Sequence, residues 1–284
     1  MVRFPETWAI GRRSLDLSRR PCIMGILNVT PDSFSDGNSF FSREKAVDRA
    51  LEMEAEGADI IDIGGESTRP NAAPVDEQEE LRRVIPVIEG LAGRLKIPIS
   101  IDTYKASVAG AALAAGAEIV NDISGLSFDI RMAEVVAVAG SGLVVMHTRG
   151  NPLEMQANTA YGDIIAEITA SLRGSLALAA SAGIAADRIA VDPGIGFGKS
   201  VSGNLEIVRR LAEFAELGRP VLVGPSRKSF IGKVLGRESD DRLYGTAAVV
   251  AVALVNGASI FRVHDVKEMR DVADMARALS RPGA

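Results

Sequence analysis

The feature that most constrains the fold is a regular alternation of short apolar runs with longer stretches of helical character. The short runs are rich in β-branched residues, and most are apolar at successive positions rather than at every second one. Continuous apolarity is typical of strands buried on both faces, as in a parallel sheet covered by helices. Eight such runs are predicted as strands: 22–27, 59–63, 97–101, 118–120, 142–146, 189–191, 221–223 and 259–263.

The stretches between these runs carry Ala, Leu, Glu and Arg with the spacing of helices. Several end at glycine, which favours a helix C-terminus, and Gly57, Gly116 and Gly257 each precede an alanine in what looks like the same helix-to-strand turn. The predicted helices are 43–56, 76–95, 105–115, 130–139, 161–182, 204–217, 243–256 and 266–279.

Eight strand–helix units in 284 residues predict an α/β fold with one domain over residues 1–284, a (β/α)8 or TIM barrel that spans about 22–280. The main alternative is a doubly wound open sheet, which usually has a glycine-rich phosphate loop after its first strand. Here NVTPD follows that strand instead. Residues 1–20 form a short N-terminal extension, and we expect it to cap the bottom of the barrel with Trp8 packed there.

Composition limits the kinds of partner that the chain can have. A net charge of −5 gives no indication of binding to nucleic acid or to an anionic membrane. The single cysteine, Cys22, excludes an intrachain disulfide and is expected to be a buried thiol, which fits a reducing compartment. The N-terminus has no apolar stretch of signal-peptide type, and the longest apolar run, 247–255, is too short to span a bilayer. These features predict a cytoplasmic protein.

Polar side chains follow the C-terminal ends of the predicted strands, whereas the N-terminal ends show no such pattern. They are Asn28, the segment 64–69, Asp102, Asn121, Asp122, His147, Asp192, the segment 226–228, Arg262 and His264. In a barrel the active site is built from the loops at this end. Taken singly, Asp102 could be a helix N-cap, Asn121 a turn residue and His147 a core histidine. Together they predict a site, because independent caps would not supply carboxylates, an amide, a lysine and an arginine at one rim.

The residue types at this rim match a ligand with a ring at one end and a diphosphate at the other. Oxygen atoms of Asp102, Asn121 and Asp192 can accept hydrogen bonds from a flat, nitrogen-rich heterocycle, and Lys228 can donate to a ring carbonyl or nitrogen. Arg69, Arg262 and His264 could hold a phosphate or diphosphate. Asn28 could give an oxygen to Mg²⁺, which usually keeps several waters and bridges to substrate phosphates. The long loops 28–41 and 64–75 are candidates for lids.

Four segments of this chain resemble the dihydropteroate synthase family, whose members are pterin-binding barrels. The segments read MGILNVTPDSFSDG at 24–37, GGESTRP at 64–70, DPGIGFGK at 192–199 and SRKSFIG at 226–232, and RVH at 262–264 also fits. The resemblance runs from about residue 22 to 264. Asn38 and Asn71 depart from it, since glycines are common there, so the geometry of the two loops is open.

The resemblance implies a transferase of folate biosynthesis. Such an enzyme condenses 6-hydroxymethyl-7,8-dihydropterin pyrophosphate with p-aminobenzoate to give 7,8-dihydropteroate and pyrophosphate, with Mg²⁺ as cofactor. It also implies an ionisation-first mechanism, in which pyrophosphate leaves, a pterin methylene cation forms and the aniline nitrogen attacks it. Sulfonamides would compete with p-aminobenzoate, and the family suggests a homodimer.

The same resemblance implies a role for each matching residue. The residues implied as catalytic are Asp102, Lys228 and Asp36. Those implied to bind the pterin ring are Asp102, Asn121, Asp192 and Lys228. Those implied to bind pyrophosphate are Thr68, Arg69, Arg262 and His264. Those implied to bind p-aminobenzoate are Phe34, Thr68, Pro70, Phe197 and Ser229, the last at the expected start of a helix whose N-terminus could receive the carboxylate. Asn28 would ligate Mg²⁺.

Two other functions are compatible with the same residues. A corrinoid-dependent methyltransferase would share the acid and amide pterin set but would not need Arg262, His264 or the loop after Asn28. A non-catalytic paralogue would bind a pterin or a partner protein without turnover, but such a paralogue should have lost part of the set, and none of it is missing here.

Overall fold

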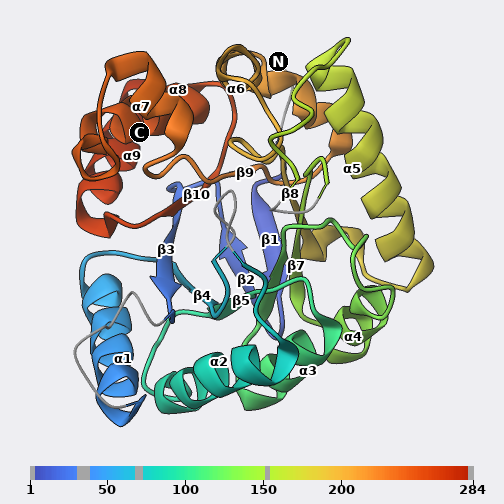
Figure 1. The fold of residues 1–284 in the computed structure, drawn as a ribbon, viewed down its shortest axis with the longest axis vertical. Coiled ribbons are helices and arrows are strands. Elements are labelled where there is room, and N and C mark those ends of the chain that lie inside the picture. The colour runs from blue at the N-terminus through green and yellow to red at the C-terminus, as the bar shows by residue number, and fades with distance from the viewer. Residues whose placement is uncertain (1–3, 31–38, 68–72, 151–153, 281–284) are drawn as a thin grey trace.

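The molecule is a nearly closed barrel of eight parallel strands surrounded by helices, as predicted (Figure 1). The structure is a computed structural model that describes residues 4–30, 39–67, 73–150 and 154–280. The strands are hydrogen-bonded in the order β8-β7-β6-β5-β4-β3-β10-β9, and a parallel bridge between Val191 and Val221 joins the last strand to the first. Their bounds are β3 Cys22–Asn28, β4 Ile60–Gly64, β5 Ile99–Asp102, β6 Ile119–Asp122, β7 Gly142–Met146, β8 Ile189–Asp192, β9 Leu222–Val223 and β10 Ile260–Val263.

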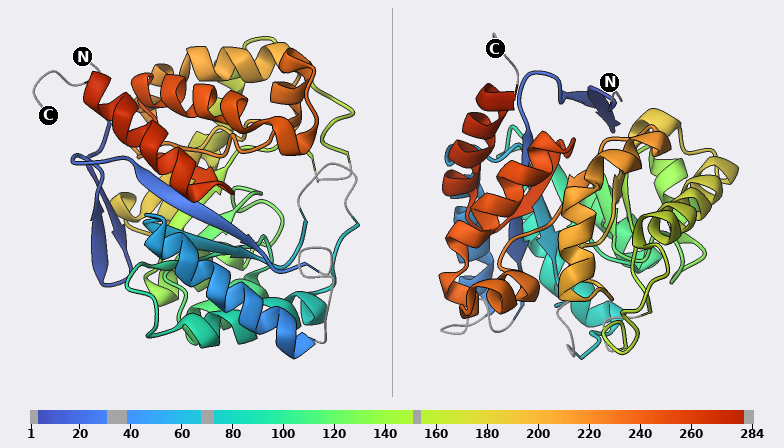
Figure 2. Two further views of the ribbon diagram at one scale, coloured as in Figure 1. Left: turned by 90° about the vertical axis from the view of Figure 1, so that its left-hand side faces the viewer. Right: turned by 90° about the horizontal axis from the view of Figure 1, so that it is seen from above.

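Helices form the outer layer of the barrel (Figures 1 and 2). Their bounds are α1 Ser39–Ala55, α2 Glu77–Leu91, α3 Ala106–Ala115, α4 Met132–Ala139, α5 Ile164–Ser181, α6 Val201–Arg209, α7 Ser229–Leu235, α8 Leu243–Val255 and α9 Val266–Ser280, with short 3-10 turns η2 Ala186–Arg188, η3 Leu211–Leu217 and η4 Ser239–Asp241. The single helix predicted over 204–217 was wrong, because α6 ends at Arg209 and η3 follows it. The Asn256 amide donates to the Val208 carbonyl at 2.8 Å, so a side chain from the end of α8 takes up a carbonyl in the last turn of α6.

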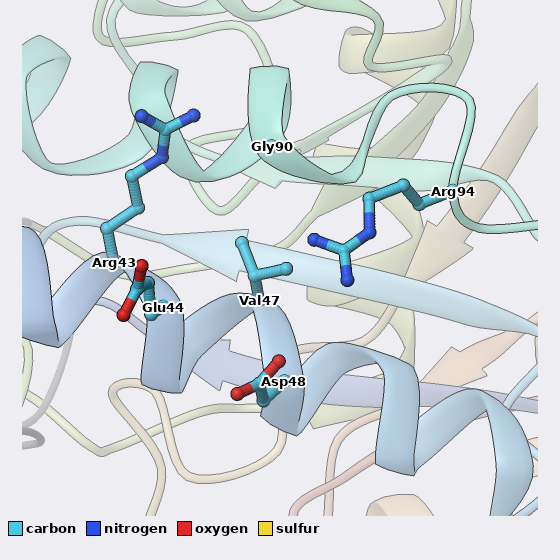
Figure 3. Close-up of a pocket in the computed structure, with 6 residues that line it drawn as sticks. All are labelled: Arg43, Glu44, Val47, Asp48, Gly90 and Arg94. Atoms are coloured by element: carbon cyan, nitrogen blue, oxygen red, sulfur yellow. The ribbon is translucent and has the colours of Figure 1, made fainter.

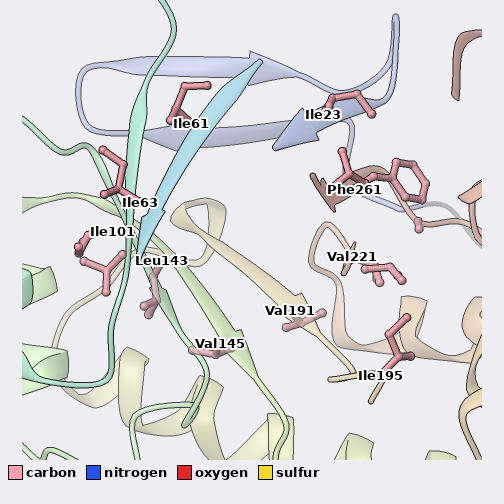
Figure 4. Packing of buried hydrophobic residues seen from close by; sticks show 14 of the residues in the cluster. Ile23, Ile61, Ile63, Ile101, Leu143, Val145, Val191, Ile195, Val221 and Phe261 are labelled. Carbon is pink, nitrogen blue, oxygen red and sulfur yellow. The ribbon is translucent and has the colours of Figure 1, made fainter. Parts of the chain in front are cut away.

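The strands are apolar at successive positions because both of their faces are buried, one against the helices and the other in the barrel interior. Residues that point outward pack against the helices in one large cluster, of which Figure 4 labels Ile23, Ile61, Val145 and Phe261 among others. The alternate residues, such as Ile60, point inward and form a second cluster that fills the barrel. Both faces are therefore dry, which is the environment that the sequence pattern indicated.

The N-terminal extension is an antiparallel hairpin of β1 (Thr7–Ile10) and β2 (Arg13–Asp16), which stands across one end of the barrel (Figure 2). Trp8 is fully buried and packs in the same cluster as Met24 and Ile60 of the barrel interior. Its indole Nε1 donates to the Arg188 carbonyl at 2.8 Å. The expectation that this segment caps the barrel with Trp8 packed there is confirmed, although the two strands were not predicted.

Helix α5 is the one helix, within the described ranges, that is long and apolar enough to cross a membrane by length and composition alone. It lies in the outer layer of the barrel and packs against β7 and η3. Ile168 and Leu172 on this helix are fully buried. A core helix of a barrel meets the same criterion, so α5 is accounted for by the fold.

Candidate active site

The alternation of the strands brings a layer of polar side chains to the C-terminal end of the barrel interior. On four strands a polar residue stands two positions after a residue that faces the interior. Asp62 follows Ile60, Asn121 follows Ile119, Asp192 follows Ala190 and Arg262 follows Ile260. On β5 the corresponding residue is Asp102, which pairs with Asn121 in the sheet register. We call Asp62, Asp102, Asn121, Asp192 and Arg262 the polar layer.

Arg262 links the polar layer across the barrel. Its Nε lies 2.5 Å from Asp62 Oδ2, and its Nη2 lies 2.6 Å from Asp102 Oδ2. Asn121 Nδ2 donates to the same Asp62 oxygen at 3.1 Å. Side chains from β4, β5, β6 and β10 thus meet at one place, as the sequence analysis predicted for three of these four. In this state the Arg262 guanidinium is bound to carboxylates of the polar layer.

Two carboxylate oxygens of the polar layer have their hydrogen-bonding capacity unused. Asp62 Oδ1 and Asp102 Oδ1 are buried and, among the described residues, have no hydrogen-bond partner. Buried acceptors are nearly always satisfied in folded proteins, so two unpaired ones within the polar layer are available to accept hydrogen bonds from a ligand. These two oxygens can accept hydrogen bonds from neighbouring N–H groups of a planar heterocycle.

Burial sets the protonation behaviour of the groups around Arg262. It raises the pKa of the Asp102 carboxyl to about 7, even though Arg262 acts in the opposite direction. It also raises the pKa of Asp192 to about 6, against the effect of Gly194 N–H and of nearby cations. Burial and Arg262 together lower the pKa of Lys228 to about 8. Acidic and basic groups that titrate close to neutral pH are typical of sites that move charge during a reaction.

Lys228 stands between the polar layer and the aromatic ring of Phe197. Its Nζ lies 4.0 Å from the Phe197 ring centroid, and the charges of Asp192 and Asp102 favour its protonated form, against the burial that lowers its pKa. It is also the N-cap residue of α7, which begins at the exposed Ser229, where the sequence predicted a helix to start. The structure therefore brings Lys228, Phe197 and Ser229 together on one side of the polar layer.

The remaining predicted site residues differ in how much the structure says of them. His264 follows β10, and its Nδ1 lies 2.9 Å from Ser226 Oγ. Asn28 ends β3 and pairs with Gly64 in the sheet register, at the same end of the barrel. The other predicted residues, which are Phe34, Asp36, Thr68, Arg69 and Pro70, lie outside the described residues.

The described residues fit a metal only if the substrate supplies most of its ligands. They contain no group of three or more His, Cys, Asp or Glu side chains that could hold a metal ion. Asn28 offers a single amide oxygen at the barrel end. This set suits Mg²⁺, which keeps several waters and is commonly bound through substrate phosphates.

The sequence analysis missed Asp62, although a signal for it was present. Asp62 lies inside the apolar run Ile60–Gly64 and is fully buried, where an aspartate is rare without a partner. It stands two residues after Ile60, which packs in the barrel interior, so strand alternation places it on the inward face. Asp122, which follows Asn121, faces the other way and instead accepts from the Ser124 and Leu126 N–H groups at 2.8 Å each.

The structure also separates the alternatives left open for two residues. Asp102 does not cap α3: the Ala106 N–H donates to Asp129 Oδ2 at 3.0 Å, and Asp102 binds Arg262. His147 is 6% exposed and its Nδ1 lies 2.9 Å from Lys199 Nζ, as expected of a satisfied core histidine, and burial, Lys199 and Arg149 lower its pKa to about 3.

A pocket of about 420 Å³ lies outside the barrel between α1 and α2 (Figure 3). It is lined by Arg43, Glu44, Val47, Asp48, Gly90 and Arg94. None of these residues is among the predicted site residues. Glu44 and Asp48 offset the charges of the two arginines, so the pocket does not favour an anion.

The chain is similar to pterin-binding enzymes of several bacteria over almost all of its length. A family model described as "Pterin binding enzyme" matches residues 24–264. The dihydropteroate synthase of Synechocystis is 48% identical over 279 residues, which is 98% of this chain and 96% of that protein. The Xanthomonas albilineans dihydropteroate synthase with 4-aminobenzoic acid superposes with a TM-score of 0.90 at 43% identity, over 96% of this chain and 98% of that one. The Burkholderia cenocepacia dihydropteroate synthase complexed with 7,8-dihydropteroate gives 0.88 at 42%, over 98% and 97%.

Proposed function

The chain belongs to the pterin-binding enzymes, in the dihydropteroate synthase family, and from this premise we propose how its barrel-end residues carry out the reaction. It is a transferase of folate biosynthesis. It condenses 6-hydroxymethyl-7,8-dihydropterin pyrophosphate with p-aminobenzoate and releases pyrophosphate. The matched relatives are synthases along nearly the whole chain, which disfavours the methyltransferase alternative.

The pterin ring binds at the polar layer, with its N–H groups directed at Asp62 Oδ1 and Asp102 Oδ1. The buried, unpaired state of these two oxygens is the observation that carries this assignment. Asn121 on β6 and Asp192 on β8 belong to the same polar layer and supply further polar atoms for the ring. Lys228 donates a hydrogen bond to a ring oxygen or nitrogen. A ring that replaces some contacts of Arg262 with Asp62 and Asp102 would release this guanidinium toward the pyrophosphate.

The reaction breaks the bond between the pterin methylene carbon and the pyrophosphate oxygen, and both bonding electrons leave with pyrophosphate. Positive charge then develops on the methylene and spreads into the ring. The ionised Asp102 stabilises this charge because it is fixed beside the ring before the bond breaks. The aniline nitrogen of p-aminobenzoate attacks the cation, forms the new C–N bond and loses a proton.

Arg262 and His264, together with Thr68 and Arg69, hold the leaving pyrophosphate in this proposal. Mg²⁺, which Asn28 would ligate, neutralises charge on the pyrophosphate oxygens when it is bound. The p-aminobenzoate ring lies beside Phe197 and Lys228, with Ser229, Phe34 and Pro70 completing its surroundings. Asp36, from the first loop, is the third residue that we propose to be catalytic.

We further propose that the protein is a homodimer in which α8 is buried between the two copies. This helix contains no charged residue, yet it exposes a stripe of Tyr244, Ala248, Val252 and Val255. The three larger side chains are 85%, 47% and 64% exposed. A helix that is apolar on all sides is normally buried. The four stripe residues are spaced by three or four positions, so they form one continuous exposed apolar face.

The function is tested with purified protein, Mg²⁺ and both substrates. We expect pyrophosphate and dihydropteroate to form in equal amounts, and neither dihydropteroate nor steady pyrophosphate release when p-aminobenzoate is left out. The control without enzyme measures spontaneous breakdown of the pterin substrate. Absence of product with both substrates and Mg²⁺ present would falsify the proposal in favour of a non-catalytic paralogue.

A further inference from the structure

Lys199, at the end of the loop that follows β8, is a buried lysine without a carboxylate partner. It is 4% exposed, and its Nζ lies 2.9 Å from His147 Nδ1, 2.8 Å from the Phe197 carbonyl and 3.3 Å from the His147 carbonyl. An ammonium group has three N–H donors, so these three acceptors use all of them. It forms no ion pair in the part of the chain that the structure describes. A buried cation of this kind is costly to stability, so its presence indicates a role in the site.

The loop 193–199, which follows β8 and ends at Lys199, packs closely between the end of β7 and Lys228. Gly194 has φ 69°, and a Cβ there would lie 1.9 Å from the His147 carbonyl oxygen. Gly196 has φ 85°, and a Cβ there would lie 2.8 Å from Lys228 Cδ. The backbone can approach both neighbours only because these two residues have no side chain. The position of Phe197, between Gly196 and Lys199, is therefore determined by the contacts that hold this loop.

We propose that Lys199 is a positioning residue for the p-aminobenzoate side of the site, because its ammonium holds the Phe197 main chain to His147 and so fixes the Phe197 ring against Lys228. The proposal rests on the proposed synthase function. Lys199 acts through Phe197 and does not touch substrate. It needs no change in Asp62, Asp102, Asn121 and Asp192, the pterin-binding residues that lie on the strands.

The charges around Lys199 agree with this role. Asp192 on β8 faces it and favours its charged form, whereas burial, Lys228 and Arg149 disfavour that form, and together they lower the pKa of Lys199 to about 7. His147 is neutral, because burial is the largest cause of its lowered pKa, so Nδ1 can accept the hydrogen bond. Lys199 in turn favours the ionised form of Asp192. If the Lys199 ammonium loses a proton, one of its three hydrogen-bond donors is lost and the Phe197 main chain is held less firmly.

The test compares Lys199→Met with wild-type enzyme, because methionine is an unbranched side chain only one atom shorter than lysine and lacks its charge and donors. We expect the KM for p-aminobenzoate to rise on the order of tenfold. We expect the dissociation constant of a bare pterin, measured by calorimetry, to change much less than this KM, although the variant loses one of the charges that favour ionised Asp192. Lys199→Gln keeps a donor for the Phe197 carbonyl, so its KM should lie between those of the other two proteins.

Two controls separate this role from a general loss of structure. His147→Asn keeps an acceptor near the position of Nδ1 and should leave the KM for p-aminobenzoate within about twofold of wild type. Asn204→Ala removes the bond from Gly196 N–H to Asn204 Oδ1, 2.6 Å long, and the bonds from its amide to the Lys199 and Ser200 carbonyls, without removing a charge. It should raise that KM less than Lys199→Met does. A lower folded fraction reduces kcat but not KM, so misfolding cannot imitate the expected result.

The outcomes distinguish this proposal from the proposed function. Absence of turnover in the wild-type protein overturns the synthase assignment. An active wild type with an unchanged p-aminobenzoate KM in Lys199→Met overturns only the role of Lys199. The role of Lys199 is also overturned if Lys199→Met loses pterin affinity as much as p-aminobenzoate affinity, because this would mean that the whole barrel end had moved. If Lys199→Met does not fold, the Lys199→Gln result decides in the same way.

Discussion

Asp102 takes part in two sets of interactions at once. One of its oxygens binds Arg262, and the other is buried and has no partner among the residues that the structure describes. The first contact favours the ionised carboxylate, and burial opposes it, so the pKa of Asp102 is raised to about 7. The ionised carboxylate, which Arg262 favours, thus stands beside the place where a cation would form in the proposed reaction. This arrangement is electrostatic preorganisation, which is usually the largest single contribution to catalysis.

Asp102→Asn is expected to lower kcat on the order of 10²–10³-fold, while the affinity for a bare pterin falls much less. The amide keeps a hydrogen-bonding oxygen but loses the charge that the cation requires. Steady-state kinetics and calorimetry measure the two effects. Asp122→Asn is the matched control, because Asp122 is a buried aspartate that only shapes the turn after β6. Equal losses of turnover and affinity in Asp102→Asn would contradict the role given to its charge.

The raised pKa of Asp102 and the lowered pKa of Lys228 predict a bell-shaped dependence of kcat/KM on pH. Asp102 must be ionised, so activity rises as pH increases through about 7. Lys228 must be protonated, so activity falls as pH increases above about 8. The maximum should lie between the two values. Lys228→Arg should remove the alkaline limb but keep the acidic one, and a wild-type profile without an acidic limb would refute the assignment of Asp102.

At the scale of elements, the strands were predicted better than the helix boundaries. Each strand is buried on both faces, which leaves a continuous apolar run that is easy to recognise. At the break between α6 and η3, the Val208 carbonyl accepts a hydrogen bond from Asn256, which is distant in sequence, so no local pattern contains this contact. The β1–β2 hairpin was missed for a similar reason, since its stability comes from the barrel interior that Trp8 enters.

Trp8→Ala should destabilise the protein by about 3–5 kcal/mol, because it empties a fully buried position at the bottom of the barrel. The KM values should stay unchanged, since the polar layer lies at the other end of the strands. Denaturant unfolding and steady-state kinetics test both statements. Trp8→Phe refills most of the space but loses the bond to Arg188, so a smaller cost of about 1 kcal/mol is expected. Wild-type stability in Trp8→Ala would show that the hairpin is not a cap.

At the scale of the whole molecule, the apolar stripe on α8 predicts how copies of the chain associate. Val252→Glu places a charge in the middle of this stripe and should convert the dimer to a monomer, because an unpaired charge is costly to bury. Light scattering after gel filtration measures the mass. Val138→Glu makes the same change at an 85% exposed valine on α4 and should leave the mass unchanged. A dimer that persists in Val252→Glu would rule out this face.

The sequence by itself determined the barrel and the end of it that carries the site, because burial on both faces of a strand and the run of polar residues after it are local properties of the chain. It also indicated Asp102, Asn121, Asp192, Lys228 and Arg262, which the structure brings to the same end. Only the tertiary structure decided that Arg262 is bound to Asp62 and Asp102, that His147 is a neutral core residue, and that Lys199 holds the loop beside Phe197. These outcomes depend on distances across the barrel between residues up to 200 positions apart in the chain, and no local pattern encodes such distances.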